Sequence, residues 1–278
     1  MFKQREAIIR LLKDGDPDTV NLTKSQLVQG GPGTIPDLRD LLTADDRQVT
    51  AHVQEILTEI ESKYAREALE RICRNISILT DLEHASWYVA QIFLHGLELE
   101  PYQSKIDSWG QELSQRLSSC DSDASRVMTM CQFFGKELGL HGNESDYYNA
   151  RNSLLPCVID TRLGIPISLS LVYMMVARRA DCVVDGINLP GHFVVRHGTL
   201  LFDPFHEGRI LTTEDCARGF GPVLPREIRK LNQDHFQSAH PKLILYRMLA
   251  NLLYIFQHEQ HGESYKMILQ WIRLLEPK

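Results

Sequence analysis

The chain has 278 residues, of which 43% are hydrophobic and 24% are charged, and its formal net charge is −6 at pH 7. This length and composition are typical of a globular protein with room for one large domain or two modest ones. The acidic balance and the scattered basic residues argue against binding to nucleic acid or to an anionic membrane, because those partners require a concentrated positive patch.

The sequence also argues against secretion and membrane insertion. The opening segment MFKQREAIIRLLKDGD alternates charged and apolar residues too closely for the apolar core of a signal peptide. No stretch approaches the roughly 20 consecutive apolar residues that cross a bilayer. The cysteines are widely spaced and form no Cys-x-x-Cys pair, which favours reduced thiols over a disulfide or zinc framework. We therefore expect a cytoplasmic protein.

The first half of the chain follows helical periodicity. A helix is predicted over Gln4–Lys13, and a helical pair over Ile35–Leu42 and Gln48–Ile60, with Asp45 or Asp46 capping its second member. Helix, short polar turn and helix resemble one HEAT-type unit. Further helices are predicted over Ala65–Leu79, Asp81–Leu94, Pro101–Leu117 and Ala124–Leu138.

Strand signals appear only after a predicted helix over Ile167–Arg179. Three short segments are rich in β-branched or aromatic residues and are bounded by Gly or Pro: Cys182–Asn188, His192–His197 and Thr199–Asp203. Two final helices, Lys242–Gln257 and Glu263–Leu275, resemble a tetratricopeptide hairpin. The predicted fold class is therefore α+β, with a small antiparallel sheet in a central region that helical segments flank.

The strands around Gly198 predict that an imidazole and a carboxylate share one face of a hairpin. If His197-Gly198 forms a two-residue turn, His192 lies directly opposite Asp203. If Gly198-Thr199 forms the turn, Asp203 faces Val194 and lies one diagonal away from His192, on the same face. A three-residue loop would break this parity. An adjacent carboxylate orients a histidine ring and stabilises its protonated form, as catalysis or binding requires. A purely structural hydrogen bond within the sheet is the alternative.

Ser168 falls in the first turn of a helix that Pro166 begins. The exposed N–H groups of a helix start favour developing negative charge, but a serine hydroxyl there still needs a general base such as His192. Alternatively, Ser168 caps the helix or packs as a small polar residue.

Other chemistries find less support in the sequence. His192 and His197 point to opposite faces of one strand, and His192, Asp203 and His206 lack the sequence frame of a known metal site. Cys182 is expected in the core, and Cys157 is an alternative nucleophile position. We expect neither a metal nor a cofactor.

Residues 82–216 resemble the SirB-type family of transglutaminase-like proteins. The motifs that carry the likeness are Tyr147-Tyr148, Arg151-Asn152-Ser153-Leu154, the segment from Arg162 to Ser170, Pro190-Gly191-His192-Phe193 and Asp203-Pro204-Phe205. The resemblance implies a papain-like fold in residues 81–235, after an N-terminal HEAT-like segment (1–80) and before a tetratricopeptide-like hairpin (236–278).

The transglutaminase-like superfamily uses a Cys–His–Asp triad, and the resemblance assigns its His and Asp to His192 and Asp203. Ser168 stands at the helix start where the superfamily has its Cys, which argues against thiol catalysis. Two functions follow. The first is a degenerate, non-catalytic member that binds a peptide or protein. The second is a Ser–His–Asp acyl hydrolase, amidase or peptidase that uses Ser168, His192 and Asp203, with Arg151 and Asn152 helping to bind the substrate.

Overall fold

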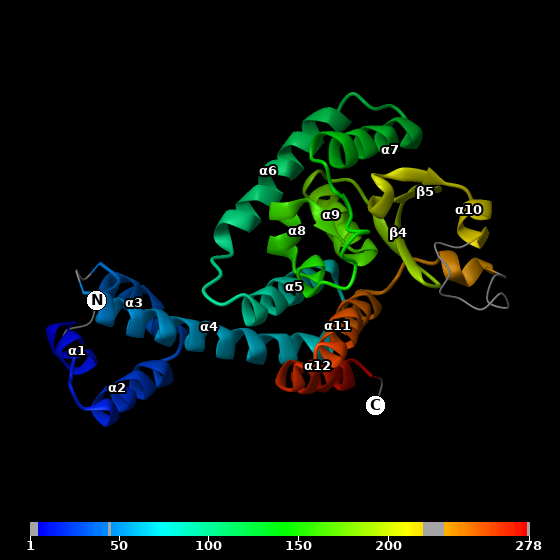
Figure 1. Ribbon diagram of the computed structural model, residues 1–278. Coiled ribbons are helices and arrows are strands. Elements are labelled where there is room, and N and C mark those ends of the chain that lie inside the picture. Colours follow the sequence, from blue (N-terminus) through cyan, green and yellow to red (C-terminus); the bar gives the residue numbers. More distant parts are fainter. Residues whose placement is uncertain (1–4, 44–45, 219–230, 277–278) are drawn as a thin grey trace. The chain divides into compact units, whose positions relative to one another are not determined.

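The computed structural model describes residues 5–43, 46–218 and 231–276 (Figure 1). Gln4 and Asp45, named in the sequence-based predictions, lie outside these ranges. The chain divides into two compact units, one formed by Met1–Arg71 and Tyr88–Leu97 and the other by Ile72–Trp87 and Glu98–Lys278. The residues of helices α4 (Arg47–Asn75) and α5 (Leu79–Phe93) are divided between the two units. The predicted domain boundaries after residues 80 and 235 stay a prediction.

The first unit is helical. Its elements are α1 (Arg5–Leu12), α2 (Pro17–Gln29), the 3₁₀ turn η1 (Pro32–Thr34), α3 (Ile35–Leu41), most of α4 (Arg47–Asn75) and the end of α5 (Leu79–Phe93). Helix α2 was not predicted, although Asp16 accepts hydrogen bonds from the N–H groups of Asp18 and Thr19 and Pro17 stands at the first helical position.

Apolar side chains from all four helices of residues 5–60 form one core. Its buried members include Leu12 of α1, Val28 of α2, Leu38 of α3 and Val53 of α4. Asp46 caps α4 by accepting hydrogen bonds from the N–H groups of Gln48 and Val49, as predicted.

The two helices predicted over Gln48–Ile60 and Ala65–Leu79 are one continuous helix, α4, which ends at Asn75. The prediction of a break was wrong. Residues 61–64, Glu-Ser-Lys-Tyr, contain neither glycine nor proline, so nothing in them stops a helix.

The second unit is mostly helical with two small sheets, which confirms the predicted α+β class. Its helices beyond α5 are α6 (Glu100–Leu117), α7 (Asp123–Cys131) with a π-helical continuation η2 (Gln132–Glu137), η3 (Ala150–Ser153), α8 (Leu155–Thr161), α9 (Pro166–Arg179), η4 (Pro204–His206), α10 (Thr213–Arg218), η6 (Gln233–Phe236), α11 (Pro241–His258) and α12 (Gly262–Leu275). Helix α8 was not predicted.

Helix α9 is the centre of this unit. Every residue from Pro166 to Ala177 is buried, as expected for a helix enclosed on all sides. It packs against α6, the strand β4 (His192–His197), η4 and α11. Residues near its start are therefore held by neighbours from several segments.

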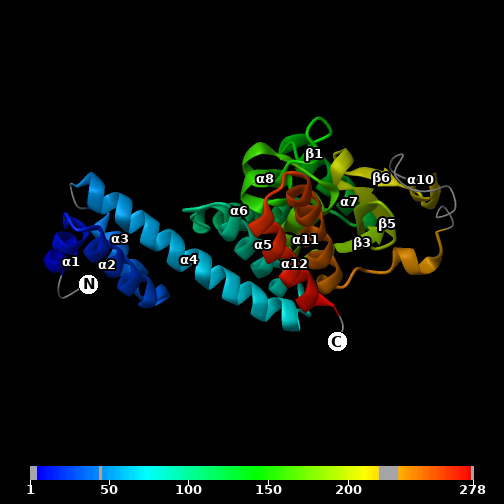
Figure 2. The same ribbon diagram turned by 60° about the horizontal axis from the view of Figure 1, so that its bottom comes forward.

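The main sheet, whose strands β3, β5 and β6 are labelled in Figure 2, is antiparallel with the strand order β3-β4-β5-β6. Its strands are β3 (Asp185–Leu189), β4 (His192–His197), β5 (Leu200–Asp203) and β6 (Arg209–Leu211). In the β4–β5 hairpin His197 pairs with Leu200, so the turn is Gly198-Thr199, the second of the two predicted turns. Gly198 has φ +56°, which suits a glycine in such a turn. A second sheet pairs β1 (His141–Gly142) with β2 (Leu163–Gly164) in parallel.

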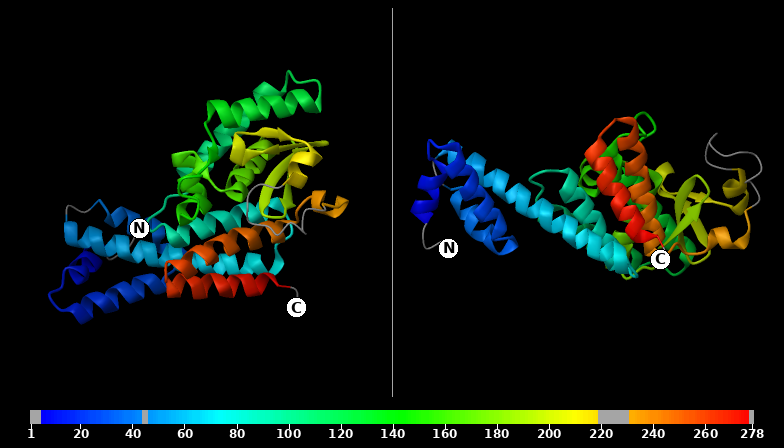
Figure 3. Two further views of the ribbon diagram at one scale, coloured as in Figure 1. Left: turned by 45° about the vertical axis from the view of Figure 1, so that its right-hand side comes forward. Right: turned by 90° about the horizontal axis from the view of Figure 1, so that it is seen from below.

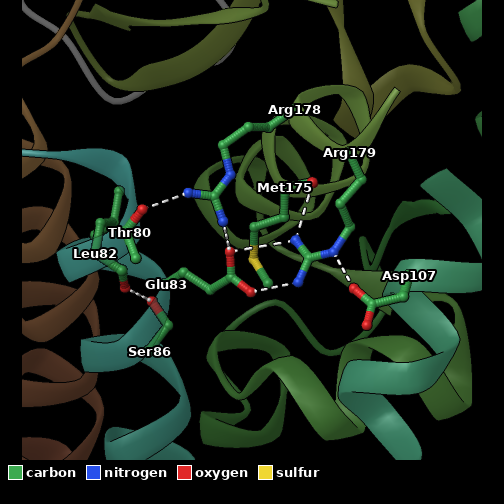
Figure 4. A network of polar contacts seen from close by, with 8 residues as sticks. All are labelled: Thr80, Leu82, Glu83, Ser86, Asp107, Met175, Arg178 and Arg179. Atoms are coloured by element: carbon green, nitrogen blue, oxygen red, sulfur yellow. Dashed lines mark hydrogen bonds and ion pairs between the residues drawn. The ribbon is translucent and has the colours of Figure 1, made fainter. Parts of the chain in front are cut away.

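The C-terminal end of α9 is tied to α5 and α6 by a charged network (Figure 4). Glu83 on α5 is buried and forms ion pairs with both Arg178 and Arg179. Arg178 also donates to Thr80, at 2.6 Å, and Arg179 pairs with Asp107 on α6. The adjacent arginines therefore serve internal packing.

Helices α11 and α12 lie side by side as an antiparallel hairpin (Figures 2 and 3). Their buried residues include Leu245 and Leu252 of α11 and Ile268 and Trp271 of α12. Helix α11 also contacts α9 and η3, which places one of its faces beside the candidate site.

No helix within the described ranges is both long enough and apolar enough to span a membrane. All six cysteines are free thiols.

Candidate functional site

Asp203 is the centre of a buried hydrogen-bond cluster. Its Oδ2 accepts a hydrogen bond from His192 Nε2, at 2.9 Å, and another from His206 Nδ1, at 2.6 Å. Its Oδ1 accepts from the backbone N–H of Phe205 at 3.0 Å. Asp203 ends β5 and His192 begins β4, so the hairpin register places both side chains on one face.

The cluster holds the carboxylate in its charged form. Burial raises the pKa of Asp203, but the hydrogen bonds from His192 and His206 outweigh burial and lower this pKa from 3.8 to about 2. The same bond to Asp203 raises the pKa of His206. His192 is 4% exposed and Asp203 0%, whereas the His206 side chain is 42% exposed. His206, which the sequence placed only in a disfavoured metal site, is thus the solvent-facing member.

His192 and His206 open onto a cavity of about 690 Å³. Four segments supply its walls: the loop before η3, the start of α9, the β4–η4 region and one face of α11. The lining residues are Glu144, Tyr147, Tyr148, Ile165, Pro166, Gly191, His192, Phe205, His206, Arg247, Ala250, Asn251, Tyr254 and Ile255.

Aromatic rings follow one another along this cavity. The ring of Tyr147 lies 6.0 Å from that of Phe205 and 5.2 Å from that of Tyr148, measured between centroids. The ring of Tyr148 lies 5.2 Å from that of Tyr254 on α11. Tyr148 and Tyr254 are largely exposed, at 59% and 46%. Such a row of aromatic side chains offers stacking surface to a bound molecule.

Ser168 lies at the start of α9, fully buried, and is not among the cavity-lining residues. Its Oγ lies 2.6 Å from the backbone carbonyl oxygen of Asn152, to which it donates, and 3.1 Å from that of Ile165. It also accepts from the Ile165 N–H, at 3.1 Å. Within the described residues the Ser168 hydroxyl has no hydrogen bond to His192. The Ser168 side chain therefore joins the start of α9 to η3.

Asn152 is equally committed to internal contacts. Its amide nitrogen donates to the carbonyl oxygens of Asp146, at 2.6 Å, and Tyr147, at 3.1 Å. Its amide oxygen accepts from Asn143 at 3.0 Å. Asn152 thus shapes the loop that carries the cavity residues Tyr147 and Tyr148. Arg151 is exposed, and neither it nor Asn152 lines the cavity.

The remaining candidates from the sequence are a metal site and two cysteines. The ligand atoms of His192, Asp203 and His206 lie within 4.8 Å of one another, so these residues could hold a metal ion; the two hydrogen bonds through Asp203 Oδ2 account for this closeness. Burial raises the pKa of both Cys157 and Cys182, which disfavours the nucleophilic thiolate.

Sequence reasoning missed the contribution of α11. Between Leu243 and Phe256 its residues are apolar or aromatic except for Arg247 and Asn251, which are one helical turn apart. Both line the cavity. Two polar residues at this spacing in an otherwise apolar stretch were the available signal.

The sequence pattern of the transglutaminase-like superfamily matches residues 100–250. A UPF0162 protein from Xylella fastidiosa is 34% identical over 163 residues, 56% of this chain and 58% of the relative. A UPF0162 protein from Pseudomonas aeruginosa is 37% identical over 173 residues, 60% of this chain and 59% of the relative.

A mouse protein, F-box only protein 21, is 32% identical over 144 residues, 48% of this chain and 22% of that protein. The matched region thus spans somewhat more than half of the bacterial relatives and about a fifth of the mouse protein. No solved structure matches significantly.

Proposed function

This chain belongs to the transglutaminase-like superfamily, and we propose that it is a non-catalytic member that binds a peptide or protein segment in the cavity beside His192 and Asp203. The observation that carries the proposal is the burial of Ser168, whose hydroxyl donates to the carbonyl of Asn152. A nucleophile must present its oxygen to both the substrate and a general base. The Ser168 hydroxyl instead stabilises a helix start.

The cavity has the size and lining of a binding site. Ligand pockets of about 300–1,000 Å³ combine apolar and aromatic walls with a few polar groups, and this cavity of about 690 Å³ does the same. The exposed rings of Tyr148 and Tyr254 at its margin suit the side chains of a peptide.

We also propose the finer family assignment that the motifs favour. In it the chain is a cytoplasmic, SirB-type protein with a papain-like central domain, and its HEAT-like N-terminal and tetratricopeptide-like C-terminal helices add protein-interaction surface. The occurrence of the matched region within an F-box only protein supports a module that operates in different protein contexts.

A peptide selection tests the binding function. Random peptides displayed on phage are selected against the full chain, and the enriched sequences are synthesised and titrated. Ala250 lines the cavity, so Ala250→Trp should fill it and weaken binding at least about tenfold. Ala124→Trp, at an exposed position on α7, is the matched control and should bind as wild type does. Failure to enrich peptides, or equal binding by Ala250→Trp, would overturn the proposal.

The second function, a Ser–His–Asp acyl hydrolase, amidase or peptidase, is favoured by one observation: His192, which is hydrogen-bonded to the buried Asp203, lines the cavity. In that reaction Ser168 Oγ would attack an acyl carbon while His192 accepted its proton and then donated it to the leaving group, and water would hydrolyse the acyl-serine. A fluorophosphonate probe discriminates the two functions. Labelling of Ser168 that disappears in His192→Ala supports the hydrolase, and an unlabelled wild type supports the binding protein.

A further inference from the structure

One face of α11 forms a continuous wall of the cavity. Its lining residues Arg247, Ala250, Asn251, Tyr254 and Ile255 follow the spacing i, i+3, i+4, i+7 and i+8, which is a single stripe of an α-helix. The stripe contains a cation, an amide and an aromatic ring in sequence along about two helical turns.

Arg247 is half-buried and is anchored through one nitrogen. Its Nη1 donates to the side-chain oxygen of Asn188 and to the carbonyl oxygens of Leu189, at 3.4 Å, and His192, at 3.0 Å. Its guanidinium carbon lies 5.9 Å from the centroid of the Phe193 ring. These contacts fix the plane of the guanidinium at the β3–β4 turn.

These contacts use Nη1 and do not involve the other side of the guanidinium, which Nε and Nη2 share. These two N–H groups form the fork that binds a carboxylate through two parallel hydrogen bonds. Neither donates to any residue within 5–43, 46–218 or 231–276, and no carboxylate in these ranges forms an ion pair with Arg247. Glu144, the single carboxylate in the described lining, is exposed and forms no ion pair with Arg247 within these ranges. A half-buried cation without a counter-ion is complementary to an anionic ligand.

Asn251 lies one turn beyond Arg247 on the same stripe. Its side-chain amide forms no hydrogen bond with the described residues, and Asn251 lines the cavity. An amide offers a donor and an acceptor together, which is the pair that a peptide group requires.

We propose that Arg247 and Asn251 are the recognition residues of this cavity and that its ligand is a peptide bearing a carboxylate. The inference rests on the proposed peptide-binding function and names the class of ligand. The Nε–Nη2 fork of Arg247 binds the carboxylate, Asn251 pairs with a neighbouring peptide group, and Tyr254 and Tyr148 stack against a side chain. The carboxylate comes either from a peptide C-terminus or from an Asp or Glu side chain.

Two acid–amide pairs of probes distinguish these sources. N-acetyl-tyrosine and N-acetyl-tyrosinamide differ only at a terminal carboxylate. N-acetyl-tyrosyl-glutamate amide and N-acetyl-tyrosyl-glutamine amide differ only at a side-chain carboxylate. Each is titrated into the ¹⁵N-labelled full chain and followed by NMR. We expect the acid of at least one pair to bind at least about tenfold more tightly than its amide, and the pair with the larger ratio identifies the source.

Variants of Arg247 and Asn251 show which residue causes the preference for the acid over the amide. Arg247→Gln should abolish the difference between acid and amide, whereas Asn251→Leu should weaken both members of a pair alike. Arg273→Gln, an exposed arginine on α12, is the matched control and should keep the preference. Because Arg247 Nη1 also holds the β3–β4 turn, Arg247→Lys is a second variant. It retains the charge without the fork and should retain only part of the preference.

Three results would overturn the inference: equal affinity for acid and amide in the wild type, a preference that survives Arg247→Gln, or no binding of any probe. If phage-selected peptides bind the cavity without a carboxylate preference, the inference fails and the proposed function stands. If the acids bind as expected but no peptide is enriched, the carboxylate site stands and the peptide-binding function fails.

Discussion

The hydroxyl of Ser168 donates a hydrogen bond of 2.6 Å to the backbone carbonyl of Asn152, sixteen residues earlier in the chain. This bond joins the start of α9 to η3, next to the loop that carries Tyr147 and Tyr148. Gly164 packs against the same hydroxyl, since a Cβ added there would lie 2.8 Å from Ser168 Oγ. The helix start is therefore closely packed around Ser168.

Ser168→Ala should destabilise the protein by about 1–3 kcal/mol, because it leaves the buried carbonyl of Asn152 and the N–H of Ile165 without their partner. Ser170 supplies a matched control on the same helix. It is also fully buried, and its hydroxyl finds no hydrogen-bond partner in the described residues. Ser170→Ala should be neutral or stabilising. Urea unfolding of both variants measures the difference, and equal losses would contradict this role for Ser168.

A thiol placed at position 168 should react slowly. Burial opposes the thiolate that attacks iodoacetamide, and Ser168 is fully buried. Ser122→Cys is the matched control, because Ser122 also stands at a helix start, α7, but is exposed. At about pH 6 we expect Ser168→Cys to react more slowly than Ser122→Cys, as mass spectrometry would record. Faster reaction at position 168 would favour the acyl-transfer geometry and the hydrolase.

The His206–Asp203 hydrogen bond should make stability depend on pH. The pKa of His206 is raised above its ordinary 6.5 by Asp203, so its contribution is complete below pH 6.5 and is lost as pH rises through the folded-state pKa. The difference in unfolding free energy between wild type and His206→Gln should therefore be larger at about pH 5.5 than at about pH 8.5. The same comparison in an Asp203→Asn background should show no such change. A difference independent of pH in the wild-type background would refute the pairing.

The contribution of Asp203 to stability changes with pH in the opposite direction to that of His206. Its pKa is lowered to about 2, so its contribution is present above the ordinary value of 3.8 and is lost as pH falls from there to about 2. Acid unfolding of Asp203→Asn should consequently lack the part of the wild-type transition that lies in this range. Superimposable acid transitions in the two proteins would contradict the assigned pKa.

Glu83→Gln should destabilise the second unit by about 2 kcal/mol, because it leaves Arg178 and Arg179 around a neutral side chain. Glu112→Gln is the control: Glu112 pairs with Arg116 on the surface of α6, and an exposed pair contributes about 0.5 kcal/mol. Thermal and urea unfolding measure the loss of stability in each variant. A loss for Glu83→Gln no greater than that for Glu112→Gln would show that the network adds little stability.

Local sequence signals predicted much of the fold. Proline at position 166 and the apolar run behind it predicted α9, and Gly198 predicted the hairpin whose register brings Asp203 to the His192 face. These signals suffice because helix starts and tight turns depend on residues close together in the chain. Helix α2 was missed although Asp16 and Pro17 signalled its start.

The sequence by itself determined the α+β class, the superfamily motifs and the pairing of His192 with Asp203, since each depends on periodicity, turn chemistry or adjacent strands. Only the tertiary structure decided that Ser168 bonds to Asn152 and that Arg247 and Asn251 face the cavity. Those contacts join segments far apart in the chain, so their partners are selected by the packing of α9 and α11, which no local pattern specifies.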